Sequence, residues 1–380
     1  MKFNHLLLFL LGGILTISAC KDDDDPTVIP YDDAVEQYAK IVYASYEDSY
    51  NAALELKAAI DAFVADPTSA NFEACKVKWL DARIPYGQTE AYRFYGGPID
   101  DEDGPEGLIN AWPMDESFID YVAGNANAGL INDPGTYPEI SKQVLLDLNE
   151  SISETSIFTG YHAIEFLLWG QDLSTDGPGA RPYTDFVDGG TAANQDRRRT
   201  YLTVVTDLLL DNLEEVLLEW APGGTYRASF VALDAKVSLG KVFTALGELS
   251  KGELAGERMF VAVDSKDQED EHSCFSDNTH VDIAMNYLGI KNVYYGNYVR
   301  VDGSTIAGTG MNALATVADE TKAKAVDDAF AAVDVAMMEL PVPFDQGILN
   351  AEDDILPIIE ALRDLSDRLA DVGVALDLEF

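Results

Sequence analysis

Apolar residues recur at helical spacing through most of this 380-residue chain, and this periodicity constrains its fold more than any other feature. In residues 32–67, a stripe that opens with Val35, Tyr38, Val42 and Tyr46 lies near the 3.6-residue repeat. Similar patterns predict helices over 68–97 (bent or interrupted at Pro85), 139–169, 195–220, 228–251, 254–288, 318–340 and 351–374. The one tempting strand is "NVYYGNYVRV", residues 292–301. We therefore predict an all-α fold.

The segment "APGGTYR", residues 221–227, separates four predicted helices from four more. Gly and Pro interrupt helices, so this segment is the best candidate for a domain boundary. We predict two helical-bundle domains, residues 32–222 and 223–380. The matching numbers suggest an ancient duplication, although the two halves show no clear residue-level repeat.

The N-terminus, "MKFNHLLLFLLGGILTISAC", combines a lysine, a short apolar stretch and a small-residue junction, which is typical of a secretory signal peptide. Its end resembles the bacterial lipobox, so we expect residues 1–19 to be removed and Cys20 to be lipidated. An ordinary signal peptide with an incidental cysteine is the alternative. Residues 20–31 form an acidic tether, and their "KDDDDP" resembles the signal that sends some Gram-negative lipoproteins to the cell surface. We expect an outer-membrane lipoprotein exposed at the cell surface, with a periplasm-facing one as the alternative.

The chain carries 25 basic and 67 acidic residues, a formal net charge of −42. Such a surface repels the phosphates of nucleic acids and anionic lipids, and it attracts cations. Nucleic-acid binding is therefore excluded, and contact with the membrane is expected only through the lipid anchor.

Two further cysteines, Cys75 and Cys274, lie far apart in the sequence. They can pair in an oxidising compartment, but sequence cannot test their proximity. Two isolated, buried thiols are the simpler interpretation.

The stretch "TSIFTGYHAIEFLLWGQD", residues 155–172, places a histidine and a glutamate inside an apolar, aromatic run. On a helix, Phe158, His162, Glu165 and Trp169 fall on one stripe. An imidazole and a carboxylate spaced in this way can ligate one metal ion. The alternative is a structural pair in which the histidine is hydrogen-bonded to its neighbouring carboxylate.

A second unusual seam lies in "KVKWLDARIPYGQTEAYRFYGGPID", where Trp79, Arg83, Tyr86, Glu90 and Arg93 follow a heptad-like spacing. Buried Arg and Glu are costly unless they are paired, so Glu90 bound to Arg83 or Arg93 is one interpretation. The other is a polar cleft in which Glu90 faces a metal ion and an arginine holds an anion.

The remaining histidines of the mature chain, His272 and His280, lie in the acidic segment "SKDQEDEHSCFSDNTHVDI". Their spacing places them on one face if the segment is helical. They belong either to a site rich in acids or to a solvated helix start that carries two incidental histidines.

These three stretches resemble the signature blocks of the imelysin-like proteins, also called the imelysin peptidase family. "GYHAIEFLLWG" carries the GxHxxE motif of that family, and the blocks come in the expected order over essentially the whole mature chain. The resemblance implies two helical bundle-like domains with a site in the cleft between them, in secreted or lipid-anchored bacterial proteins associated with iron uptake. By matching position, it implies a site that contains Gly160, His162, Glu165, Arg83, Glu90, Arg93 and Asp100, and from the third block His272, Ser273, Asp277 and His280. From their chemistry we predict His162 and Glu165 as two metal ligands and Glu90 as the third, with His272 or His280 as alternatives for the third.

The chemistry of these residues favours binding over hydrolysis. A zinc peptidase needs three protein ligands, an open position for water and a general base. The chain has neither HExxH nor HxxEH, because Phe166 follows Glu165. Carboxylates and imidazole suit iron without any reaction. We predict that the protein binds a metal ion, iron or an iron complex, with zinc as the alternative, and contributes to iron uptake, with an outer-membrane transporter as a candidate partner. A zinc-dependent imelysin-type metallopeptidase is the alternative function.

Overall fold

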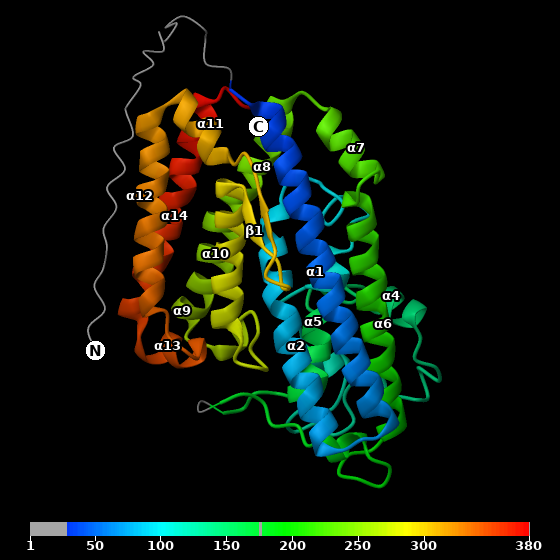
Figure 1. Cartoon of the computed structure of the whole chain (residues 1–380). Helices are drawn as coiled ribbons and strands as arrows, with labels where there is room; N and C mark the ends of the chain where they lie inside the picture. Colours follow the sequence, from blue (N-terminus) through cyan, green and yellow to red (C-terminus); the bar gives the residue numbers. More distant parts are fainter. Residues whose placement is uncertain (1–28, 175–176, 380) are drawn as a thin grey trace, which may run out of the picture.

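The computed structural model describes residues 29–174 and 177–379, and these residues are predominantly helical (Figure 1). The α-helices are α1 (Tyr31–Ala65), α2 (Ser69–Thr89), α3 (Glu106–Ile109), α4 (Lys142–Leu148), α5 (Gly160–Trp169), α6 (Gln195–Trp220), α7 (Thr225–Ala232), α8 (Ala235–Glu248), α9 (Val261–Ser265), α10 (Thr279–Tyr295), α11 (Met311–Ala318), α12 (Glu320–Ala336), α13 (Phe344–Asn350) and α14 (Glu352–Ala375). A π-helical segment, η5 (Leu249–Phe260), joins α8 to α9. The prediction of an all-α fold is confirmed.

Short elements complete the chain. The 3-10 turns are η1 (Glu90–Tyr92), η2 (Glu116–Phe118), η3 (Leu130–Asn132), η4 (Tyr183–Phe186), η6 (Gln268–Asp270) and η7 (Met337–Glu339). The strands β1 (Asn297–Val299) and β2 (Thr305–Ala307) pair as an antiparallel hairpin, with Tyr298 opposite Ile306. The tempting run at 292–301 therefore contains one short strand, preceded by the end of α10.

The first half is built around α1, which packs along both α2 and α6. The apolar stripe of α1 explains this packing, because Val35, Tyr38, Val42 and Tyr46 are all buried. Helix α5 contacts α2 and α6 and is buried over its whole length. The motif residues are thus buried within the molecule rather than on its surface.

The second half packs α14 against α12, η5 and α8, while α10 contacts both η5 and α2 of the first half. In Figure 1, α12 and α14 lie on the side of the molecule away from α1 and α6, with α10 between. Residues 221–224 separate α6 from α7 and α8, yet α7 and α8 contact α1. The division into domains at 222 and a duplication stay predictions.

Three of the helices expected from periodicity are interrupted. The predicted helix over 228–251 is divided into α7 and α8 at Leu233 and Asp234. The predicted helix over 139–169 is in fact α4 and α5, separated by residues 149–159; Glu150 has φ +55° and Gly160 has φ +81°, which a continuous α-helix does not allow. The predicted helix over 254–288 ends at Ser265, where Lys266 adopts φ +58°, and α10 begins only at Thr279. His272 therefore lies in a loop, and the expected shared helical face of His272 and His280 is wrong.

The part of the chain that the structure describes was predicted to contain no membrane span, and it contains two cysteines. No helix there is both long and apolar enough to cross a bilayer. The predicted signal peptide, Cys20 and most of the tether lie outside the described residues. Cys75 and Cys274 are buried and free, in agreement with the simpler interpretation.

Candidate functional site

The glycine of the GxHxxE motif sets the start of the motif helix. Gly160 begins α5 with a positive φ, and a Cβ atom there would lie 2.4 Å from the carbonyl oxygen of Ile109. Only glycine lets the backbone at the end of α3 approach the motif helix so closely. This contact places the next residue, Asn110, inside the polar cluster described below.

His162 and Glu165 contact each other one turn apart on α5. Nδ1 of His162 lies 2.8 Å from Oε2 of Glu165. The backbone N–H and the hydroxyl of Ser276 donate to Oε1 of Glu165 over 2.9 and 2.7 Å. Burial raises the pKa of Glu165 to about 8, although the Ser276 donors oppose the shift. Burial, together with Arg83, lowers the pKa of His162 to about 3. Glu165 therefore orients the imidazole from one side.

A second histidine is held in the same way from the other half of the chain. Nδ1 of His272 lies 2.8 Å from Oδ2 of Asp282, which also accepts from the Ser273 hydroxyl over 2.5 Å. Arg83 donates to Oδ1 of Asp282 over 3.1 Å. Burial alone would raise the pKa of Asp282, but Arg83 and the His272 and Ser273 hydrogen bonds hold it well below its usual range. Burial lowers the pKa of His272 to about 3, so its ring is neutral and its single proton is on Nδ1, where the Asp282 carboxylate accepts it.

The two imidazoles face each other in the interior. Their ring centroids are 4.7 Å apart with an interplanar angle of 74°, and the ring of Trp112 lies 5.7 Å from that of His272. Nε2 of His162 is buried and has no hydrogen-bond partner. An unpaired ring nitrogen in a protein interior is costly, so this atom calls for an explanation.

Glu90 lies beside this pair, but its charge is already balanced. Its Oε2 accepts from Arg93 over 2.7 Å and from Arg258 of η5 over 2.6 Å. Burial alone would raise the pKa of Glu90, but these two guanidinium groups hold it well below its usual range. Arg93 also pairs with Glu106 at 3.1 Å. Oε2 of Glu90 is thus paired with Arg93, one of the two arginines considered as partners from the sequence, and Arg258 is an additional partner.

Asn110 joins the two parts of the cluster. Arg83 donates to its Oδ1 over 2.6 Å, which identifies the opposite atom as the amide nitrogen. That nitrogen lies 3.4 Å from Oε1 of Glu90 and 3.4 Å from Nε2 of His272. The 3.4 Å contact to Oε1 of Glu90 is therefore longer than the hydrogen bonds of 2.7 and 2.6 Å that Oε2 accepts.

Three of the residues implied by the family resemblance lie outside this cluster. Asp100 accepts from the backbone N–H groups of Phe94 and, over 2.9 Å, of Gly97, so it stabilises a loop. Asp277 is in the loop before α10 with φ +56°, and its carbonyl oxygen accepts from Nδ1 of His280 over 3.0 Å. The structure shows no contact of these side chains with the His162–His272 pair.

Sequence reasoning missed four members of the cluster: Asn110, Arg258, Ser276 and Asp282. A usable signal existed for Asp282, because it is a carboxylate in the first turn of α10 and follows His280 by two residues. Arg258 gave a weaker one, as a basic residue on an apolar helical stripe. Nothing in the local sequence distinguishes Asn110 or Ser276 from other loop residues.

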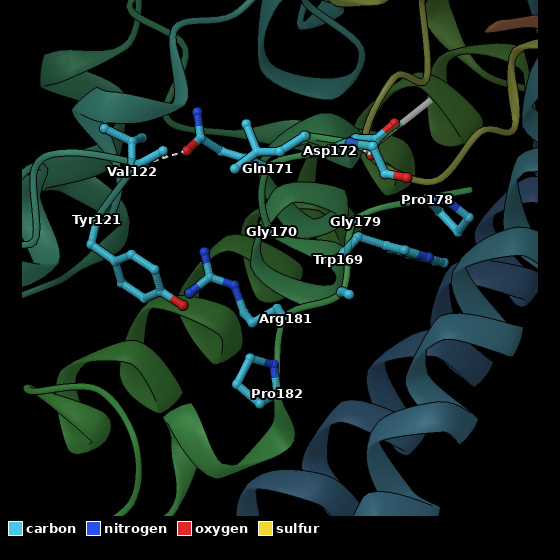
Figure 2. A pocket seen from close by; sticks show the side chains of 14 residues that line it. Tyr121, Val122, Trp169, Gly170, Gln171, Asp172, Pro178, Gly179, Arg181 and Pro182 are labelled. Atoms are coloured by element: carbon cyan, nitrogen blue, oxygen red, sulfur yellow. Dashed lines mark hydrogen bonds between the residues drawn. The ribbon is translucent and has the colours of Figure 1, made fainter. Parts of the chain in front are cut away.

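The cluster is closed to solvent. Arg83, Glu90, His162, Glu165, His272 and Asp282 are each between 0% and 2% exposed. A separate pocket of about 440 Å³ lies past the C-terminal end of α5, with Tyr121, Trp169 and Arg181 among its walls (Figure 2). None of the predicted site residues lines it. The expected cleft between the halves is therefore a buried interface, although its residues do come from both halves.

The donor atoms of the cluster suit a metal ion, but they are not assembled around one. Within residues 29–174 and 177–379, no three His, Cys, Asp or Glu side chains converge as a metal site requires. The chemistry nevertheless fits, because two neutral imidazoles in edge-on contact each have Nδ1 beside a carboxyl group, which leaves Nε2 as the nitrogen available to a metal ion. This arrangement is common around histidines that bind metals.

Comparisons with known proteins agree with the fold and the motif. The family model described as Imelysin matches residues 42–370. Iron-regulated protein A of Synechococcus elongatus is 24% identical over 342 residues, which cover 87% of this chain and 82% of that protein. A crystal structure of a candidate iron-regulated protein A precursor from Parabacteroides distasonis has a TM-score of 0.68 at 18% identity, covering 93% of this chain and 97% of that chain.

Proposed function

This chain belongs to the imelysin family, and from that premise we propose that it is a cell-envelope lipoprotein that binds iron, as an ion or in a complex, between its two halves. The lipid on Cys20 would hold it at the outer membrane, exposed at the cell surface. There it would contribute to iron uptake, with an outer-membrane transporter as partner. The name of the cyanobacterial relative supports the link to iron, and the acidic surface would concentrate cations near the protein.

The observation that carries this proposal is the buried pair His162 and His272. Nδ1 of each ring is occupied by a carboxyl group, that of Glu165 or that of Asp282, so Nε2 is the nitrogen left for a metal ion. Nε2 of His162 has no partner in the folded chain, and a metal ion would satisfy it. Imidazole nitrogen suits Fe(II) and Zn(II). Oε1 of Glu90 would supply a carboxylate oxygen, whereas Glu165 would orient His162 rather than bind the metal.

Entry of the ion requires the two halves to part locally, because the pair is buried. The contacts at the centre of this interface include buried ion pairs: Arg83 pairs with Asp282, and Arg258 pairs with Glu90. Polar interfaces between parts of one chain separate more readily than apolar ones. Iron would thus be a transported ligand that reaches the histidine pair only when this buried interface opens.

Zinc-dependent proteolysis is the alternative, and the geometry favours it less. Oε2 of Glu90 is held by two guanidinium groups, and Glu165 is committed to His162 and Ser276. The remaining carboxylate oxygen, Oε1 of Glu90, is the one proposed as a metal ligand, so no second carboxylate of the cluster is left to act as the base that activates water. Cleavage of a protein substrate that stops with a chelator and returns with zinc would establish the alternative.

The test is metal binding by the delipidated protein, measured by elemental analysis and titration calorimetry with Fe(II) and Zn(II). His162→Gln and His272→Gln each remove one imidazole ligand, and we expect affinity for Fe(II) to fall by at least about a hundredfold. His280→Gln is the matched control, because that ring lies outside the cluster. Equal binding by the wild type and His162→Gln would overturn the proposal.

A further inference from the structure

Asn110 occupies the space between two strong acceptors of the candidate site. Its amide nitrogen lies 3.4 Å from Oε1 of Glu90 and 3.4 Å from Nε2 of His272. Both distances are long for hydrogen bonds, whose usual length is about 2.9–3.0 Å. Asn110 is 2% exposed, so no bulk water competes for these acceptors.

The orientation of the amide follows from its other end. Arg83 donates to Oδ1 of Asn110 over 2.6 Å, so the amide nitrogen must face Glu90 and His272. Both of these partners are pure acceptors there. Glu90 is a carboxylate between two arginines, and Nε2 of His272 carries its lone pair because the ring proton is on Nδ1 beside Asp282. The two amide hydrogens thus serve the same two acceptors that a bound cation would bridge.

We propose that Asn110 is an internal substitute for the metal ion: its amide satisfies Glu90 and His272 in the metal-free protein and must move away before a cation can bind. This inference rests on the proposed function and identifies Asn110 as the residue whose displacement lowers the affinity for the metal ion. It explains why the donor atoms are not assembled around a common point. It also assigns a role to the motif glycine, since Gly160 admits the Ile109 backbone that carries Asn110.

The substitution Asn110→Asp tests this directly. The new carboxylate can still accept from Arg83, but an oxygen replaces the amide group between Glu90 and His272. In the metal-free protein this oxygen faces two other acceptors, so we expect a lower melting temperature. With Fe(II), Co(II) or Zn(II) it becomes an additional ligand. We expect at least about tenfold tighter binding and a larger metal-induced rise in melting temperature than in the wild type.

Asn286→Asp is the matched control. Asn286 is equally buried and accepts from Arg258, but its amide donates to the carbonyl oxygen of Gly87 over 2.9 Å and has no hydrogen bond to His272. The substitution Asn286→Asp adds the same charge to the same network without adding a metal ligand, so we expect a smaller gain in affinity for the metal. An equal gain in both variants would show a general charge effect and overturn the inference.

Two other outcomes are distinguishable. If the wild type binds Fe(II) in a His162-dependent manner but Asn110→Asp binds it equally or more weakly, Asn110 is not a substitute for the ion, and the proposed function stands. If neither protein binds any of the three metals, the proposed function fails and this inference with it. Asn110→Ala provides a second check that adds no charge. Loss of the amide should tighten metal binding. If Asn110 instead ligates the metal through Oδ1, this substitution should weaken metal binding.

Discussion

Asp282 is the acceptor at the centre of the interface between the halves, and its replacement is the most informative stability test. Its Oδ1 accepts from Arg83, and its Oδ2 accepts from Ser273 and lies 2.8 Å from Nδ1 of His272. Both Asp282 and Arg83 are at most 1% exposed. Asp282→Asn keeps the shape but removes the charge, and its amide group must face one set of donors. We expect the free energy of unfolding to fall by about 3–5 kcal/mol, the usual cost of leaving a buried charge without its partner.

The assay is urea denaturation of the metal-free protein at pH 7, followed by circular dichroism and tryptophan fluorescence. The double variant Arg83→Met, Asp282→Asn leaves no unpaired charge, so its loss should be smaller than the sum of the single losses by about 2 kcal/mol or more. The control pair is Lys57 and Asp61 on α1, whose side chains are 18% and 52% exposed; neutralising Asp61 should cost less than about 1 kcal/mol. A loss for Asp282→Asn no larger than that of the control would refute the reasoning.

Three more predictions follow from burial and backbone geometry. Gly160→Ala should destabilise the fold by at least about 2 kcal/mol in the same assay and weaken metal binding, because a Cβ would lie 2.4 Å from the carbonyl oxygen of Ile109 at a positive φ; wild-type stability would contradict this. Burial, with nearby Asp345, Asp277 and Asp172, raises the pKa of Glu271 to about 9, so its neutral form is favoured in the fold and stability should decline between about pH 5 and 9. Glu271→Gln should flatten that decline by up to about 1.4 kcal/mol per pH unit, and identical pH profiles would show that the carboxyl titrates normally. Because both Cys75 and Cys274 are buried and free, these two thiols should react with a thiol reagent only on unfolding, which peptide mapping of the labelled protein would show; rapid modification of either in the native state, or a failure of both to react after unfolding, would be inconsistent with the structure.

Much of the fold could be predicted because helical periodicity is a local property. The stripe on α1 and the breaks after α1 and near residue 221 follow from side chains within a few positions of one another. The errors lie where a backbone conformation was set by a distant segment. Nothing near Gly160 says that the chain must turn there, because the reason is the approach of Ile109.

The candidate site also has a part that is local in the sequence and a part that depends on tertiary packing. His162 and Glu165 were recognisable because a polar pair in an apolar helix is conspicuous, and their contact is local. That Glu165 also accepts from Ser276, more than a hundred residues away, depends on how the halves pack. Glu90 was identified too, but its partner Arg258 comes from a helix of the other half.

By itself, then, the sequence determined a helical chain with an acidic surface and a polar motif inside an apolar helix. Composition and short-range spacing are sufficient for these properties. Only the tertiary structure decided which carboxylate orients which imidazole, and that an amide from residue 110 lies between Glu90 and His272. These choices depend on close packing and on the balance of charges in a dry interior, where a group is stable only when a partner from elsewhere in the chain meets it.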